Sequence, residues 1–280
     1  MPQLFKHPIV RNVPLVAAGI AVLALLASLE AQTGSPRSRK TTSRKTSNTT
    51  TTNTNPTAGT RDAGPQIPGW NLKFQEEFEG NGLNYSKWSP HPPATAGWGS
   101  LVDAPDWTPE AVSVSGGQAH IAARLAASGI NSGVITTVGT FAQTYGRFEI
   151  RCRMPAGAGL EPLFQLLPVP SGELPEIDAA HSLGSDPATA LFGNRWRGER
   201  TERSYTGKYG VGDLSNGFHV IAVEWDADQI VWLVDGVERF HSYEGVPHQP
   251  MYMAISLGVG GGTTRPGIFD IDYVRVYARS

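Results

Sequence analysis

Two acidic residues and a histidine stand close together in the stretch Leu174-Pro-Glu-Ile-Asp-Ala-Ala-His181. In an extended strand, Glu176 and Asp178 are two residues apart and point to the same face. Adjacent carboxylates repel each other, so one of them holds a proton or shares a hydrogen bond with its neighbour. Such a pair fits retaining glycoside hydrolysis, in which one carboxylate attacks the anomeric carbon and a second group protonates the leaving oxygen. By spacing alone, two exposed carboxylates on a solvated strand are the alternative.

The elements that must position these residues are short apolar runs separated by Gly, Pro, Asn and Asp. Between Gly146 and Met154, apolar and charged residues alternate with a period of two, as in a half-buried strand. No long amphipathic helix interrupts the runs. The pattern predicts an antiparallel β-sandwich of jelly-roll or immunoglobulin type. The clearest runs are Leu72–Phe74, Ala119–Ala123, Gly146–Met154, Leu163–Leu167, His219–Trp225, Gln229–Val234, Met251–Leu257 and Phe269–Tyr277.

An ordered set of short motifs across residues 70–278 resembles glycoside hydrolase family 16, the laminarinase and β-glucanase family. The resemblance implies an all-β jelly roll, concanavalin-like, with a glycan cleft on its concave sheet. The motifs are Phe74-Gln-Glu-Glu-Phe78, Leu83-Asn-Tyr-Ser-Lys-Trp88, Thr144-Tyr-Gly-Arg-Phe-Glu-Ile-Arg-Cys-Arg-Met-Pro155, Phe218-His219, Glu224-Trp225, Val234-Asp235-Gly236, Gly260-Gly261 and Asp272-Tyr273-Val274-Arg275-Val276-Tyr277.

The catalytic motif of the laminarinase-like branch is Glu-x-Asp-x-x-Glu. Carried over by resemblance, Glu176 is the nucleophile and Asp178 its helper, but the acid/base position holds His181. The branch without a β-bulge would place the acid/base at Ala180, so the carboxylate is absent in either register. Two positions in the preceding strand, where the family often has Trp, look like Glu161 and Gln165. Natural glucan turnover is therefore expected to be weak or altered.

His181 could replace the missing acid only if a bulge at Ala179-Ala180 turns it to the face of Glu176. Nearby carboxylates would then favour the imidazolium, which can donate a proton to the leaving oxygen. A histidine without a catalytic role is the plainer interpretation. A third alternative is a substitute carboxylate such as Glu161 or Glu199.

Other residues are candidates for binding. Trp98, Trp107 and Trp196 lie in loop-like contexts and could stack on sugar rings, and Gln165 could bind a hydroxyl. Trp88, Trp225 and Trp232 are expected in the core. No cofactor is required, but the resemblance implies a structural calcium ion with Glu77 and Asp272 as ligands. The charged run with Arg195, Arg197, Arg200 and Arg203 is expected to be a solvated loop.

Charge is unevenly distributed along the chain. Residues 1–65 hold eight Lys/Arg and two Asp/Glu, which leaves 15 bases and 23 acids in residues 66–280. The acidic body argues against nucleic acid as a partner, because phosphate binding needs a basic face. Cys152 is the only cysteine, which excludes an internal disulfide and any multi-cysteine metal site.

The N-terminus reads as a targeting segment followed by a linker. Lys6 and Arg11 precede an uncharged apolar stretch over residues 13–29, which predicts a signal peptide ending near residue 31. A retained anchor, with residues 13–29 as a membrane tether, and a cytoplasmic body are the alternatives. Residues 32–65 are rich in Thr and Ser and are expected to be a disordered basic linker. Residues 66–280 are expected to be the family 16-like domain.

These features leave two classes of function. The first is a secreted, monomeric β-glucan hydrolase of retaining type with Glu176 as nucleophile and a changed acid/base. The second is a non-catalytic glycan-binding or wall-associated protein on the same scaffold. The two differ in whether glucan is turned over or only bound.

Overall fold

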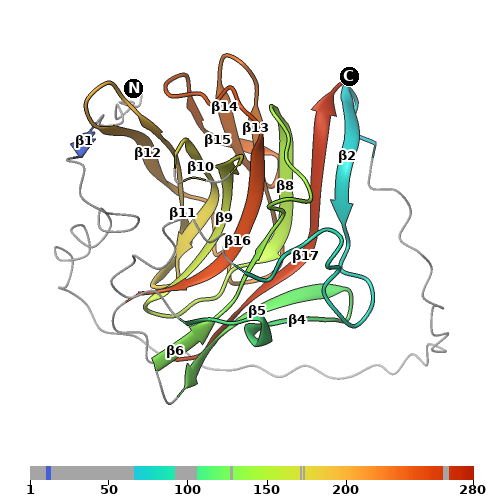
Figure 1. Ribbon diagram of the computed structural model, residues 1–280. Helices are drawn as coiled ribbons and strands as arrows, with labels where there is room; N and C mark the ends of the chain where they lie inside the picture. The colour runs from blue at the N-terminus through green and yellow to red at the C-terminus, as the bar shows by residue number, and fades with distance from the viewer. Residues whose placement is uncertain are drawn as a thin grey trace, which may run out of the picture. The chain divides into compact units, whose positions relative to one another are not determined.

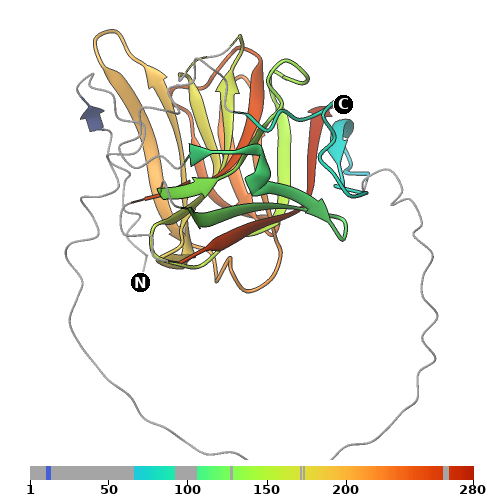
Figure 2. The same ribbon diagram turned by 60° about the horizontal axis from the view of Figure 1, so that its bottom comes forward.

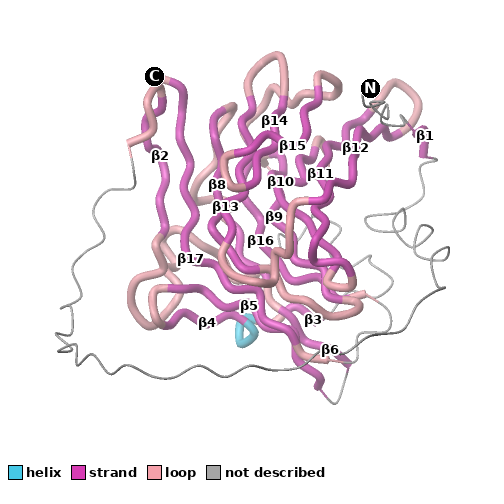
Figure 3. Tube along the Cα trace, turned by 180° about the vertical axis from the view of Figure 1, so that it is seen from behind, coloured by secondary structure: helices cyan, strands magenta, loops and turns pink. Residues whose placement is uncertain are grey.

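The computed structural model describes residues 11–13, 66–91, 106–126, 129–170, 172, 174–260 and 265–280. The predicted signal segment beyond residue 13 and the linker 32–65 lie outside this part of the chain. Within the described residues, no helix combines the length and hydrophobicity needed to span a membrane. One short 3-10 turn, Pro109–Ala111, is the helical element of this part and lies beside strand β5 (Gln118–Ala126) (Figure 3).

The described strands form two sheets (Figure 1). The first is a seven-stranded sheet whose strands are all paired antiparallel. In spatial order its strands are β1 (Arg11–Val13), β12 (Glu202–Gly210), β11 (Asp186–Arg197), β10 (Glu176–Leu183), β9 (Leu160–Pro168), β16 (Met251–Val259) and β7 (Val134–Thr136).

The second sheet is ten-stranded and antiparallel except for the short parallel pair β3 and β6. Figure 2 shows β4, β5 and β17 of this sheet in the foreground. In spatial order its strands are β15 (Val237–Ser242), β14 (Ile230–Val234), β13 (His219–Trp225), β8 (Gly146–Arg153), β17 (Gly267–Arg279), β5 (Gln118–Ala126), β6 (Gly129–Ser132) and β3 (Asp106–Trp107), while β2 (Trp70–Glu76) pairs with β17 and β4 (Val112–Ser115) with β5.

The core lies between the two sheets, as the period-two pattern predicts. Phe148, Ile150 and Cys152 of β8 are buried at 0–1% exposure and belong to the same hydrophobic cluster as residues of the seven-stranded sheet. Burying these apolar surfaces is the main favourable contribution to folding. Trp88, Trp225 and Trp232 are all buried, as expected. Members from the seven-stranded sheet include Phe164, Leu166, Ile177, Phe192, Met253, Ile255 and Leu257.

The charged run after Leu191 differs from its prediction. It was expected to be a solvated loop, but residues 186–197 and 202–210 form the long neighbouring strands β11 and β12. The side of β11 that faces the core carries Asn194, which is fully buried and donates hydrogen bonds to the carbonyls of Glu244 (2.7 Å) and Gly245 (3.1 Å). Because the buried side of β11 includes the polar Asn194, the strand lacks the regular apolar alternation from which strands are predicted.

Candidate active site

A β-bulge in β10 places the catalytic-motif residues on one side of the sheet. Between Asp178 and His181, β10 advances three residues while its partner β11 advances two, from Gly193 to Leu191. A matching shift occurs against β9. The extra residue lies at Ala179-Ala180, where a bulge was required to bring residue 181 to the face of Glu176.

The strand register defines which residues share that face. Residues directly opposite each other in an antiparallel pair project to the same side. Glu176 lies opposite Arg195, Asp178 lies opposite Gln165 on β9, and His181 lies opposite Leu163. We call this side of the seven-stranded sheet the carboxylate face. Its polar members include Glu161, Gln165, Glu176, Asp178, His181, Arg195 and Glu202.

The backbone at the bulge is fixed from the other sheet. The indole Nε1 of Trp232, on β14, donates a hydrogen bond of 2.8 Å to the carbonyl oxygen of Asp178. A bulge disrupts the ladder of hydrogen bonds, so a carbonyl there needs a partner from elsewhere. Trp232 is fully buried and packs against Phe192 of β11, and it therefore ties the position of Asp178 to the core.

Glu176 is held by two side chains from the neighbouring strands. The amide Nε2 of Gln165 donates to Glu176 Oε1 at 2.8 Å and to Asp178 Oδ1 at 3.1 Å, and so bridges the two carboxylates. The guanidinium of Arg195 forms an ion pair with Glu176 Oε2 and contacts Glu202 Oε1 at 3.3 Å. Sequence reasoning named Gln165 as a candidate but missed Arg195, because the pairing of β10 with β11 is not visible in one sequence.

The electrostatics of Glu176 are dominated by burial. Its side chain is 4% exposed, and desolvation, followed by the charge of Asp178, raises its pKa well above the usual value, whereas Arg195 opposes the rise. Glu176 therefore keeps a proton to higher pH than a free carboxyl does. Arg195 is the group that favours the ionised form of Glu176, which a nucleophile requires.

His181 is buried and faces Glu161. Burial lowers the pKa of His181, with Asp178 opposing, so the ring is more readily neutral than a free imidazole. Among the described residues, its Nε2 atom has no hydrogen-bond partner and lies 4.0 Å from Glu161 Oε2. Burial likewise raises the pKa of Glu161. The expected imidazolium at His181 is thus opposed by desolvation, which outweighs the nearby carboxylate.

The tryptophans expected to stack on sugar are not brought together beside Glu176. Trp98 lies outside the described residues. Trp107 is half-buried in β3, which pairs with β6 of the other sheet. Trp196 lies on β11 next to Arg195 and therefore projects to the opposite side, where a Cβ on Gly245 would lie 2.1 Å from its ring. Trp196 thus packs toward the interior rather than on the carboxylate face.

The two carboxylates expected to bind calcium are occupied by arginines. Glu77 accepts hydrogen bonds from Arg275 Nε (2.8 Å) and a terminal guanidinium nitrogen (3.0 Å), and Asp272 Oδ2 pairs with Arg151 at 2.6 Å. No group of three His, Cys, Asp or Glu residues in the described chain could hold a metal ion. Calcium needs six or more oxygen ligands, so this donor set does not fit it.

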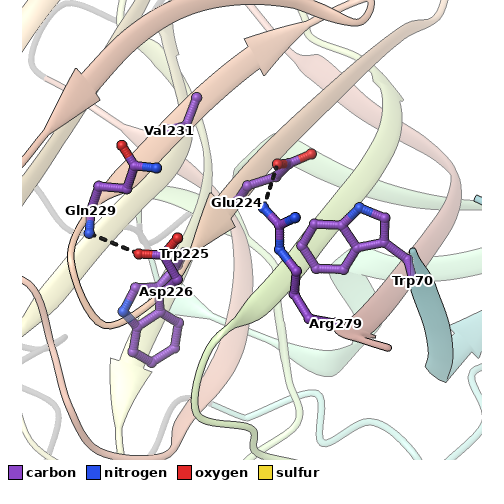
Figure 4. A pocket seen from close by; sticks show the side chains of 7 residues that line it. All are labelled: Trp70, Glu224, Trp225, Asp226, Gln229, Val231 and Arg279. Carbon is purple, nitrogen blue, oxygen red and sulfur yellow. Dashed lines mark hydrogen bonds and ion pairs between the residues drawn. The ribbon is translucent and has the colours of Figure 1, made fainter. Parts of the chain in front are cut away.

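A small pocket on the ten-stranded sheet lies apart from the carboxylate face (Figure 4). The guanidinium of Arg279 covers the ring of Trp70 at 4.6 Å from its centroid and lies 3.9 Å from Glu224 Oε2. Asp226 accepts the backbone N–H groups of Asp228 and Gln229 in the turn after β13. The polar groups here serve contacts within the chain.

The fold and its acidic sheet face define a β-sandwich protein with a candidate carboxylate site. The family model described as "Glycosyl hydrolases family 16" matches residues 103–275, and the chain belongs to this family. The predicted jelly-roll sandwich is thereby confirmed. The laminarinase of Rhodothermus marinus has a solved structure with a TM-score of 0.67 and 27% identity, covering 77% of this chain and all of that one.

Curated relatives match over shorter segments. The endo-1,3-1,4-beta-glycanase ExsH of Rhizobium meliloti (strain 1021) is 40% identical over 158 residues, which are 52% of this chain and 33% of that protein. A beta-1,3-glucan-binding protein of Penaeus monodon is 32% identical over 127 residues, which are 39% of this chain and 34% of that protein. The chain spans only about a third of the length of the first relatives it matches.

Proposed function

We propose that this chain is a retaining glycoside hydrolase directed at β-glucan, with Glu176 as nucleophile and weak turnover of natural polymers. The observation that carries the proposal is the shared face of Glu176 and Asp178, bridged by Gln165 and countered by Arg195. Family membership and the endo-glycanase and laminarinase names of its relatives support the substrate class.

Each neighbour of Glu176 has a distinct part in the proposed first step. Gln165 fixes the orientation of the carboxylate through its amide, so that Oε2 and not Oε1 pairs with Arg195. Arg195 stabilises the negative charge that the attacking oxygen needs. Asp178 works in the other direction, since its charge favours a proton on Glu176. Attack on the anomeric carbon converts Glu176 to a neutral ester, which relieves this repulsion.

The weakness of the proposed activity comes from residue 181. A glutamate there would protonate the leaving oxygen, whereas His181 is buried and its pKa is lowered. General acid catalysis typically contributes about 10²- to 10⁴-fold. A leaving group that needs no proton avoids this loss, so activated substrates should react much better than glucan.

Export is proposed from the sequence alone. The basic residues before the apolar stretch 13–29 favour a signal peptide, with a membrane tether as the alternative if the segment is retained. In this proposal the protein is extracytoplasmic and monomeric and needs no cofactor.

A non-catalytic glycan-binding protein is the second candidate. The observation that favours it is the absence of a carboxylate at residue 181, since binding requires no general acid. A relative that is named a glucan-binding protein supports it.

Turnover of an activated aryl β-glucoside oligomer tests the proposal. We expect a burst of the aryl group, faster cleavage than of laminarin, and a glycosyl ester on Glu176 detectable by mass spectrometry. Glu176→Gln should abolish all three, whereas Glu238→Gln, at an exposed position of β15, should leave them unchanged. Binding of laminarin without a burst, an ester or turnover would replace the enzyme by the glycan-binding protein.

A further inference from the structure

Glu161 is a carboxylic acid that the catalytic motif does not include but that the fold brings to the carboxylate face. It lies on β9 two residues from Leu163, the residue opposite His181, so Glu161 and His181 project to the same side. The side chain of Glu161 is 16% exposed, against 7% for His181. A carboxyl that is largely withdrawn from water and lacks an arginine or lysine partner is costly unless it is protonated. Among the described residues, Glu161 has no such ion pair.

Both oxygens of Glu161 lie in defined places. A Cβ built on Gly260 would be 3.1 Å from Oε1, and Oε2 lies 4.0 Å from His181 Nε2. A glutamate at residue 181 would direct its carboxyl into the region that the imidazole ring of His181 now occupies. The Glu161 carboxyl therefore ends beside the place where the missing acid would act, but it comes from the neighbouring strand.

We propose that Glu161 supplies, less effectively than a glutamate at residue 181 would, the general acid/base carboxyl that residue 181 lacks, and that His181 is a positioning residue for it. The inference rests on the proposed function, because it needs Glu176 to form the glycosyl ester. In this proposal the acid lies on β9 instead of β10, which accounts for a half-buried carboxyl and an unpartnered imidazole nitrogen together.

The proposed reaction has two steps, formation of the glycosyl ester and its hydrolysis, and protons and electron pairs balance in each. Glu176 attacks the anomeric carbon, and the bond to the leaving oxygen breaks with its electron pair on that oxygen, which takes the proton of Glu161. The Glu161 carboxylate then removes a proton from water as the water oxygen attacks the anomeric carbon. The ester bond breaks with its electrons on Glu176, and both residues return to their initial states.

The surroundings suit a proton on Glu161 rather than on His181. Burial raises the pKa of Glu161 and lowers the pKa of His181. The other charged groups of this face in the described chain are Glu176, Asp178, Arg195, Arg197, Glu202 and Lys208, and Lys208 pairs with Asp186 at 2.9 Å. The neighbouring positions of β16, Ser256 and Gly258, carry no titratable side chain. A neutral imidazole can accept a hydrogen bond from the Glu161 carboxyl without removing its proton.

Laminarin turnover by matched variants tests the inference. Glu161→Gln should lower turnover of laminarin by about 10²- to 10⁴-fold and remove the alkaline limb of its pH profile. It should leave the aryl burst intact, because that leaving group needs no proton. Glu238→Gln, at an exposed position of β15, is the control and should change neither measurement.

Two rescue experiments separate a chemical role from a structural one. Azide should restore steady-state turnover of the aryl substrate by Glu161→Ala and yield the β-glycosyl azide, because azide attacks the ester without a base. The double variant Glu161→Gln/His181→Glu should regain laminarin turnover, since its carboxyl is again on β10. Equal unfolding midpoints of the single variants show that the fold is kept.

The failures are distinguishable. If Glu161→Gln turns laminarin over at the unmodified rate while Glu176→Gln abolishes the burst, the inference is wrong and the proposed function stands. Absence of azide rescue with an intact burst also overturns the inference. If the unmodified protein gives neither burst nor turnover, the proposed function fails and the inference with it.

Discussion

Buried carboxylates on the two sheets are neutralised in different ways. On the side of the ten-stranded sheet that faces away from the core, each of four acids has an arginine beside it: Glu77 has Arg275, Asp272 has Arg151, Asp270 has Arg153, and Glu149 has Arg147, which also pairs with Glu224. We call the four acids and their arginines the arginine face. On the carboxylate face, Glu176 shares Arg195 with Glu202, and Glu161 faces only a histidine.

The difference shows how burial can serve structure in one place and chemistry in another. A carboxylate that is fully paired stays ionised and acts as a fixed contact. An acid that lacks its own cation instead holds a proton, and proton transfer is what general acid catalysis needs. Replacing an arginine should therefore have different effects on the stability of the protein on the two sheets.

The largest expected effect is the loss of stability on the arginine face. Arg275→Met leaves Glu77 buried and unpaired, and removal of one partner of a buried pair costs about 3–5 kcal/mol. Arg195→Met should cost less, because Glu176 can take up a proton that its raised pKa already favours. Denaturant unfolding of the two variants at neutral pH measures both losses. Equal losses of stability in the two variants would contradict the proposed difference between the two faces.

The second prediction concerns the carboxyl that the motif lacks. His181→Glu should raise laminarin turnover by up to about 10²-fold, since the bulge already directs residue 181 to the side of Glu176. Initial rates on laminarin at several pH values measure the gain. An inactive His181→Glu variant that still forms the glycosyl ester would mean that other parts of the site no longer accept the polymer.

The third prediction is a shift in pH dependence. Glu176 must be ionised to attack, so the rate falls as the pH drops below its pKa, which burial and Asp178 raise. Arg195→Gln removes the opposing cation and raises this pKa further, so the acid limb should move to higher pH by about one unit, the equivalent of roughly 1.4 kcal/mol. Rates on an activated aryl substrate from acid to neutral pH provide the measurement. A limb that moves to lower pH would contradict the role of Arg195.

The smallest expected effect is that of a chelator. Because Arg275 and Arg151 occupy Glu77 and Asp272, we expect EDTA to leave the thermal unfolding midpoint unchanged. A fall in the midpoint that added calcium reverses would show a cation site elsewhere in the chain.

Residues 146–154 and 176–181 show how far one sequence can predict the site. The alternation of Phe148, Ile150 and Cys152 with charged residues identifies a half-buried strand because one of its faces meets the core. The i, i+2 spacing likewise places Glu176 and Asp178 on one face. The requirement for a bulge before His181 followed from the family motif, and the register confirms it.

The sequence did not predict which residues of two neighbouring strands lie opposite each other. Arg195 reaches Glu176 only because residue 195 lies directly opposite residue 176, and the register of two strands far apart along the chain leaves no local signal. The same limit hid the approach of Glu161 to His181. The side taken by Trp196 was also missed, because the buried positions of β11 include the polar Asn194.

The extra residue in β10 divides the strand into two halves whose alternation is independent. In the first half, the hydrogen bond from the indole of Trp232 to the carbonyl of Asp178 fixes which side chains face away from the core. Deleting Ala180 would remove the extra residue and leave Glu176, Asp178 and His181 at alternate positions of a regular strand, so all three would still project to the carboxylate face. The bulge therefore accommodates one more residue between Asp178 and His181 without changing the face that either side chain occupies, so the spacing in the sequence can vary by one while the face stays the same.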